Sequence, residues 1–344
     1  MDFRPTVPSD AAALSDFLRR MFQSRADASF LAGPHMGWKY WSARPHWNGS
    51  RSFAASRRGA IVAHAAAWPV RVTVPGHVIP AVHLIDWAAD PEYPGAGAWL
   101  LRQIRARARL LMATGGSEMT RRILPALGFR SRGEICWFAR PVRPLRQALT
   151  TAEKDWKLPA RWLRNTAWRC SQPLSLPRRW RARALSPQDV PDALWPQPSA
   201  ATAVTERDRG LYQYLVQSPC ARHALFGLEK RSTLVGYFCL AFAPHVARIA
   251  DLWLPSTDVE DWCAAFRTAA VVAAGEKDVN EVSAWATTAV GKEALGRAGF
   301  QLRDCSTMSA LGDATLLEGR TLHLQMLDSD AGFLSGDAVS YLTC

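Results

Sequence analysis

The stretch Glu92-Tyr93-Pro94-Gly95-Ala96-Gly97-Ala98 decides how the rest of the sequence is interpreted. An apolar segment over 81–88 precedes it and predicts a β-strand. A segment with Leu101, Ile104, Ala108 and Leu111 on one face follows it and predicts a helix. Two glycines at this spacing let backbone N–H groups approach an anion, and the helix start adds unpaired donors and the positive end of its dipole. The stretch therefore predicts a loop that binds a diphosphate.

Two common phosphate-binding motifs do not fit this loop. No third glycine follows at the offset of a dinucleotide-binding motif, and no Gly-Lys-Ser/Thr follows as in a P-loop. A plain turn between a strand and a helix remains the alternative interpretation of the two glycines.

The sequence on either side of the loop alternates strands and helices. A helix with one apolar stripe is expected after Ser9-Asp10, and residues 30–50 look irregular. Strands are predicted over 52–55, 60–67, 70–74, 110–114 and 134–139, and a helix over 119–127 that ends at Gly128-Phe129.

The second half of the chain repeats this order. Strands are predicted over 224–229, 233–242, 246–254 and 282–287, and helices over 211–216, 259–274 and 292–297. The segment 83–87, with Asp86, corresponds to 248–252, with Asp251, and Gly299-Phe300 corresponds to Gly128-Phe129. Such internal repetition indicates two copies of one fold.

Length and charge predict where the copies are joined. The chain has 344 residues, of which 48% are hydrophobic, and this suits two domains. Of the net charge of +12, the segment from Arg140 to Arg183 carries 12 Lys and Arg against 2 acids. We therefore predict a first domain over 1–141, a basic linker rich in Trp and Pro over 142–204, and a second domain over 205–344.

Basic and aromatic residues alternate in this linker, with tryptophans at 156, 162, 168 and 180. The pattern is typical of segments that bind nucleic acid, an anionic membrane surface or a polyanionic glycan. A helix whose tryptophans pack between two domains is the alternative. No apolar run could span a bilayer and the start lacks a signal-peptide pattern, so a cytoplasmic protein is expected.

The remaining polar and sulfur residues predict little chemistry. The seven cysteines form no C-x-x-C pair, so we expect small buried side chains rather than a disulfide framework, and no metal site. Asp328-Ser329-Asp330 is expected to be a group of solvated side chains.

The strand over 84–91, Gly95 and Gly97 of the loop, the pair Leu100-Leu101 and the late Leu127-Gly128-Phe129 together resemble the GNAT N-acyltransferase superfamily. The resemblance covers 1–141 well and 205–312 more faintly. It implies an α/β (α+β) fold of two GNAT-like domains in tandem, each a mixed central sheet flanked by helices, with a degenerate second copy.

The resemblance implies acetyl-CoA or another acyl-CoA as co-substrate. The positions that would contact it are Trp87, Ala88 and Ala89 on the strand and Tyr93, Pro94, Gly95, Ala96, Gly97 and Ala98 in the loop. Glu92 departs from the family, which has Gln or Arg there. In the second half Pro255-Ser256-Thr257-Asp258 stands in place of the loop and contains no glycine, so no CoA is expected there.

The resemblance also implies a general base that takes a proton from the attacking amine. Asp86 is the first choice, with His83 and His64 as further candidates, and strand alternation predicts that Asp86 and His83 face opposite sides. Alternatively, Asp86 holds a bulged backbone and the two histidines are satisfied core residues. The helix over 119–127 offers no tyrosine as general acid.

These features predict an acyl-CoA-dependent N-acyltransferase, with acetyl as the acyl group and a primary amine of a small molecule or sugar as acceptor. Two alternatives remain open. One is a transferase of the same fold that uses aminoacyl-tRNA, with the linker holding RNA. The other is a non-catalytic binding module in polysaccharide or envelope assembly.

Overall fold

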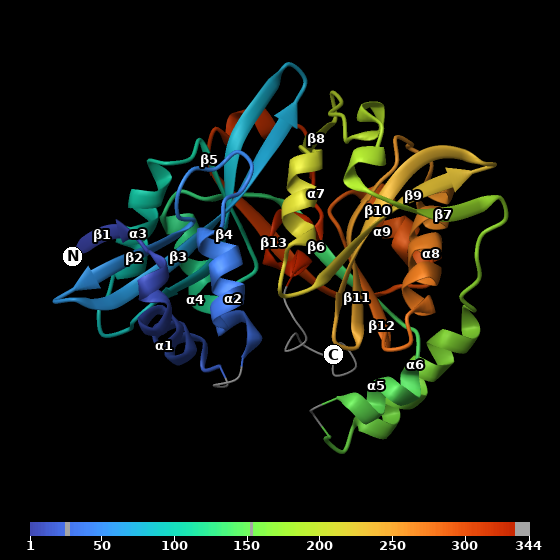
Figure 1. Ribbon diagram of the computed structural model, residues 1–344, viewed down its shortest axis with the longest axis horizontal. Helices are drawn as coiled ribbons and strands as arrows, with labels where there is room; N and C mark the ends of the chain where they lie inside the picture. Colours follow the sequence, from blue (N-terminus) through green and yellow to red (C-terminus); the bar gives the residue numbers. More distant parts are fainter. Residues whose placement is uncertain (25–27, 152–153, 334–344) are drawn as a thin grey trace.

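The computed structural model describes residues 1–24, 28–151 and 154–333. Over these residues the two halves lie side by side and share one continuous sheet (Figure 1).

Among the described residues, the first half contains six strands and four α-helices, and the glycine loop lies between the fourth strand and the third α-helix. The strands are β1 (Asp2–Pro5), β2 (Ser52–Arg57), β3 (Ala60–Val74), β4 (His77–Ala89), β5 (Leu110–Thr114) and β6 (Arg130–Pro141). The helices are α1 (Ala11–Phe22), α2 (Gly33–Met36), α3 (Ala96–Arg105) and α4 (Glu118–Ala126). The predicted order is confirmed, with β3 as one strand in place of the two expected.

The second half repeats the order of the first: a hairpin, a strand, a helix, a strand, a helix and a final strand. Its strands are β7 (Trp180–Leu185), β8 (Thr202–Thr205), β9 (Arg222–Lys230), β10 (Thr233–Ala243), β11 (Val246–Trp253), β12 (Glu281–Ala286), β13 (Gln301–Gly312) and β14 (Thr321–His323). Its helices are α7 (Arg209–Val216), α8 (Val259–Gly275) and α9 (Ala289–Arg297). The internal repeat is confirmed. Along the shared sheet the strands follow the order β1-β2-β3-β4-β5-β13-β6-β12-β11-β10-β9-β7, while β8 pairs with β3 and β14 pairs with β8.

The two halves exchange their last strands. β13 follows the second Gly-Phe but pairs with β5 of the first half, whereas β6 follows the first Gly-Phe and pairs with β12 of the second half. β6 and β13 also pair with each other at the centre of the sheet. A sequence repeat cannot reveal this exchange, because both pairings satisfy the same alternation of side chains.

The segment predicted as a linker is only partly one. It contains α5 (Pro144–Thr150) and α6 (Leu158–Ser171), but β7 pairs with β9 and β8 pairs with β3. The part of this segment from Trp180 to Leu185, where Trp180 is buried, is thus already a strand of the sheet in the second half.

A disulfide joins the exchanged strands. Cys136 of β6 lies opposite Cys305 of β13, and the two form a disulfide across 169 residues of sequence. Cys305 is also exposed, as is Cys170, so the expectation of uniformly buried, unpaired cysteines is wrong. The spacing in the sequence gave no indication, because the partners meet only through the strand exchange.

Reducing this disulfide is expected to lower the free energy of unfolding by about 2–4 kcal/mol, because the unfolded chain regains a large closed loop. Thermal and urea unfolding with and without a reductant measure the difference. The double variant Cys136→Ser/Cys305→Ser should be equally stable in both conditions. A wild-type chain that is insensitive to reductant would contradict the pairing.

Helices cover both faces of the first half of the sheet. On one face α3 buries Leu100, Leu101 and Ile104, and on the other α1 buries Leu14, Phe17 and Leu18. No helix in the described part of the chain is long and apolar enough to cross a membrane.

Candidate active site

A fork opens between two neighbouring parallel strands. β4 and β5 pair from Ala81 to His83 and then separate, since β4 continues to Ala89 without a partner on that side among the described residues. At the fork a hydrogen bond of 2.8 Å joins His83 Nε2 to Thr114 Oγ1. The fork exposes strand amides and carbonyls that an extended ligand could reach.

A β-bulge lies just beyond the fork. Against β3, β4 carries one extra residue between Ile85 and Ala88, and Asp86 adopts a φ of 49°. The bulge changes the alternation of side chains. His83 and Asp86 were expected on opposite faces, but both face residues 326–333, so that expectation is wrong.

The loop after β4 ends in a helix start that lacks a side-chain cap. Gly95 has a φ of 84°, and the amide of Ala96 donates to Tyr93 O at 3.1 Å. Within the described residues, the amides of Gly95, Gly97 and Ala98 have no hydrogen-bond partner. Three open donors at the positive end of α3 form an environment suited to an anion.

Trp87 adds a further donor beside this helix start. A Cβ on Gly97 would lie 3.1 Å from Trp87 Nε1 and 3.0 Å from Ala89 Cβ, so a larger residue would push the strand and helix apart by a few tenths of an ångström. The indole N–H of Trp87 is buried and has no partner in the described part of the chain. Glu92 is exposed, and its amide donates to Asp90 Oδ1 at 2.9 Å.

Asp86, the first-choice base, is already engaged. Its Oδ2 lies 2.8 Å from Lys39 Nζ and accepts a hydrogen bond of 2.7 Å from the Tyr40 hydroxyl. Burial alone would raise the pKa of Asp86, but the charge of Lys39 and these contacts outweigh it and lower the pKa. An ionised, paired carboxylate is a weak proton acceptor.

The two candidate histidines are satisfied core residues. His64 contacts Ser52 Oγ at 2.8 Å and Asp86 O at 2.9 Å, while His83 contacts Thr114 Oγ1 and Asp328 O, both at 2.8 Å. Burial lowers the pKa of each ring to about 4. Because both nitrogens of each ring are occupied, neither offers a free base in this arrangement.

Asp330, which the sequence pattern predicts to be in solvent, lies close enough to Asp86 and Lys39 for their charges to act on it. Asp330 is partly buried, and its side chain has no ion pair or side-chain partner among the described residues. Burial and the nearby charge of Asp86 raise the pKa of Asp330 to about 6, although Lys39 opposes the shift. No pattern near Asp330 indicates this position, because the C-terminal segment packs against β4 only in the fold.

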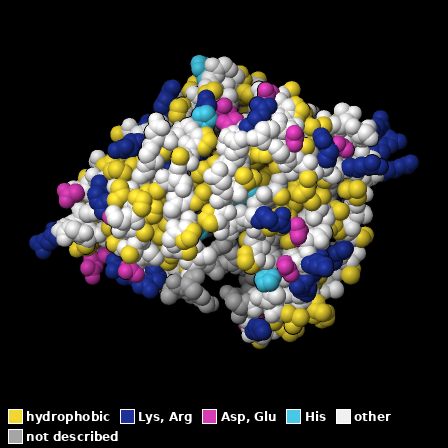
Figure 2. Space-filling model, viewed as in Figure 1, with side chains coloured by type: hydrophobic (Ala, Val, Ile, Leu, Met, Phe, Trp, Pro, Cys, Tyr) yellow, Lys and Arg dark blue, Asp and Glu magenta, His cyan; other side chains and the backbone are white. Residues whose placement is uncertain are grey.

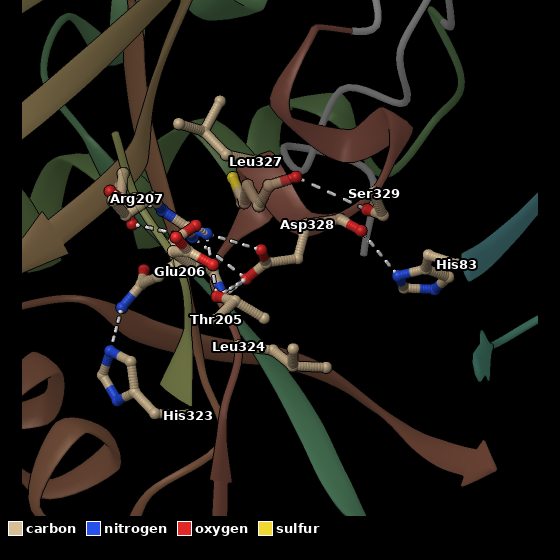
Figure 3. Close-up of polar contacts among 12 residues, drawn as sticks. His83, Thr205, Glu206, Arg207, His323, Leu324, Leu327, Asp328 and Ser329 are labelled. Atoms are coloured by element: carbon tan, nitrogen blue, oxygen red, sulfur yellow. Dashed lines mark hydrogen bonds and ion pairs between the residues drawn. The ribbon is translucent and has the colours of Figure 1, made fainter. Parts of the chain in front are cut away.

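The neighbouring Asp328 was also expected in solvent and is instead fully buried. Arg207 Nη1 lies 2.8 Å from Asp328 Oδ1 (Figure 3). Arg207 Nε lies 3.0 Å from Asp251 Oδ2. Burial would lower the pKa of Arg207, but the two carboxylates outweigh it and raise it. The backbone carbonyl of Asp328 contacts His83, so this segment ties the second half to the fork of the first.

The corresponding fork of the second half is filled by the chain itself. β11 and β12 pair only up to Ile249 and Ala284. Between them, the amide of Leu324 donates to Thr287 Oγ1 at 3.1 Å, and Gln325 Nε2 donates to Leu252 O at 3.3 Å. At the start of α8, Asp258 accepts from the Glu260 amide at 2.9 Å. The second helix start is therefore capped by a carboxylate, which disfavours an anion.

A cavity and a cluster of potential metal ligands lie apart from the glycine loop. A cavity of about 340 Å³ lies between the halves, lined by Arg44, Arg71 and Asp208 among others, but by none of the residues predicted to contact CoA. Among the described residues, Glu134 approaches the sulfurs of Cys136 and Cys305, and the disulfide engages both sulfurs.

Comparison with known proteins agrees with this geometry. Residues 2–116 match a family described as an acetyltransferase (GNAT) domain. No curated protein sequence matches the chain. The first half of the chain is therefore similar to a GNAT acetyltransferase domain.

Solved structures extend the similarity over the whole fold. An N-acetyltransferase from Anabaena variabilis, related to GCN5, has a TM-score of 0.58 at 12% identity, covering 93% of this chain and 75% of its own. N-myristoyltransferase from Saccharomyces cerevisiae gives 0.62 at 12% identity, with 90% and 80% covered. A tandem GNAT protein from the clavulanic acid biosynthesis pathway gives 0.57 at 13% identity, with 90% and 98% covered. These structures share the fold of this chain across both of its halves.

Proposed function

We propose that the chain transfers an acyl group, acetyl in the first instance, from acyl-CoA to a primary amine of a small molecule or sugar. The observation that carries this proposal is the set of open amides at Gly95, Gly97 and Ala98 beside the fork of β4. These amides would bind the diphosphate of CoA, supported by the N-terminus of α3. Tyr93, Pro94 and Ala96 would shape the same loop.

The acyl thioester would lie along the open edge of β4. Backbone N–H groups from Trp87 to Ala89 would polarise its carbonyl, whose oxygen gains negative charge as the amine attacks. The amine nitrogen forms the new bond to the acyl carbon, the C–S bond breaks, and the sulfur leaves as the thiolate of CoA.

Asp330 is the proposed acceptor of the amine proton, either directly or through a water molecule. Its carboxylate is unpaired among the described residues and lies within electrostatic range of Asp86, and its pKa of about 6 suits a base near neutral pH. Asp86 would instead hold the bulge through Lys39 and Tyr40. His64 and His83 would fix the strands on either side.

Acyl-CoA binding is tested first by thermal unfolding. Acetyl-CoA at about 100 times its dissociation constant should stabilise the chain by about 2.7 kcal/mol, which raises its midpoint by several degrees. CoA should act similarly, because the loop would bind the diphosphate, whereas pantetheine without the diphosphate should not. A chain whose midpoint is unchanged by acetyl-, butyryl- and myristoyl-CoA alike would refute the proposal.

A further inference from the structure

An exposed apolar surface lies at the end of the molecule formed by the connecting helices. Leu145 and Leu149 of α5 are 59% and 66% exposed, and Trp156 and Leu163 are 85% and 59% exposed. These four are a third of the twelve large hydrophobic side chains that are exposed in the described part of the chain. Figure 2 shows hydrophobic side chains gathered at this end, with Lys and Arg beside them.

The apolar positions follow the helical repeat of α6. Ala160, Leu163, Ala167 and Cys170 are all exposed and lie three or four residues apart, so they form one stripe on the outer face. An amphipathic helix normally turns such a stripe toward the core. Here the stripe faces solvent, and we call it, together with Leu145, Leu149 and Trp156, the outer apolar face.

Buried polar contacts fix this orientation. Asn165, on the opposite side of α6, is fully buried and donates to Gln147 Oε1 at 3.1 Å, and Gln147 donates to Glu281 Oε2 of the sheet at 2.6 Å. Trp168 packs beneath Arg303, whose guanidinium lies 4.8 Å from the ring centre. The inner sides of α5 and α6 therefore pack against the rest of the protein, and their outer sides face solvent.

Positive charge borders the outer apolar face. The segment 143–170 contains seven Lys and Arg against Glu153 and Asp155. Lys154 and Lys157 are exposed, and Arg146 is about half exposed. Exposed leucines and a tryptophan flanked by cations are the features of helices that lie in the interface of an anionic bilayer.

We propose that the outer apolar face binds the surface of an anionic lipid bilayer, with the leucines and Trp156 inserted below the headgroups. Net positive charge alone would fit RNA or an acidic glycan equally well, but neither would bury Leu149 and Leu163. The proposal stands independently of the acyl transfer reaction.

Co-sedimentation of the full chain with lipid vesicles tests the proposal. We expect at least about 10-fold more binding to phosphatidylcholine vesicles that contain one-third phosphatidylglycerol than to pure phosphatidylcholine, and a loss of binding at high salt. The triple variant Leu149→Ser/Trp156→Ser/Leu163→Ser should lose at least about 10-fold of this binding while keeping the thermal midpoint. The control Met119→Ser/Val216→Ser removes equally exposed side chains elsewhere and should bind as the wild type does.

Three results would overturn the proposal. The first is equal binding of wild type and triple variant to anionic vesicles. The second is a chain that does not bind vesicles but binds tRNA through the three side chains removed in the triple variant. The third is a wild-type dimer that the triple variant abolishes without vesicle binding, because a second copy of the chain would then cover the face.

Discussion

The variant Gly97→Glu should bind acetyl-CoA at least about 100-fold more weakly than the wild type and should show no measurable transfer. Two effects combine at this position. The new side chain meets Ala89 and Trp87 at the point where the strand and helix touch, and its carboxylate lies next to the amides that would bind the diphosphate. Losing two hydrogen bonds to a charged group, each worth about 1.5–3 kcal/mol, accounts for a loss of this size. Isothermal titration with acetyl-CoA measures the affinity.

The second copy of the fold provides a matched control for Gly97→Glu. Thr257 is exposed at the start of α8, where the corresponding loop carries no glycine. Thr257→Glu adds the same charge there and should leave the affinity for acetyl-CoA unchanged. Circular dichroism and the thermal midpoint without ligand show whether Gly97→Glu is folded. A folded Gly97→Glu variant with wild-type affinity would exclude the loop as the CoA site.

The variant Asp330→Asn should lower kcat by about 100- to 10,000-fold and leave the affinity for acetyl-CoA unchanged, because the amide keeps the shape but cannot accept the proton. In the wild type the rate should rise with pH and level off above about 6, where Asp330 is ionised. This limb should be absent from the residual activity of the variant. Steady-state rates between pH 5 and 9 measure both effects.

Measurements of stability distinguish the proposed role of Asp330 as proton acceptor from a structural role. The pKa of Asp330 is raised from 3.8 to about 6 in the fold, so its contribution to stability is present below pH 3.8 and is lost as pH rises through 6. Asp330→Asn should therefore be at least as stable as the wild type at pH 8. Asp86→Asn should be less stable, because it leaves Lys39 buried without its counter-charge. If Asp86→Asn abolishes the limb near pH 6 and Asp330→Asn does not, Asp86 is the base.

Local sequence patterns were sufficient for the elements that define the class of fold. Leu110–Thr114 was predicted as a strand with its observed bounds, and α8 and α9 differ from prediction by three residues or fewer at each end. These segments have clear hydrophobic periodicity. Asp258 and Thr288 cap the starts of α8 and α9, and α8 ends at Gly275. The glycine loop was recognised for the same reason, since it depends on neighbouring residues alone.

Contacts between distant segments could not be predicted in the same way. The exchange of β6 and β13, and with it the Cys136–Cys305 pair, joins strands of equivalent pattern, so sequence alternation is the same with or without it. Asp328 and Asp330 have the composition of a polar tail, and their burial depends on Arg207 and on the fork of β4. Asp86 lies within the bulge of β4, and its partner Lys39 lies in a segment whose sequence looks irregular.

A crystal structure of the chain with bound acetyl-CoA tests the central claim most directly. The account predicts diphosphate oxygens within hydrogen-bond distance of the amides of Gly97 and Ala98, the thioester beside the open edge of β4, and no CoA at the fork between β11 and β12. Acetyl-CoA bound at the second fork after displacement of residues 323–325, or in the cavity between the halves with the Gly95–Ala98 amides still open, would contradict it.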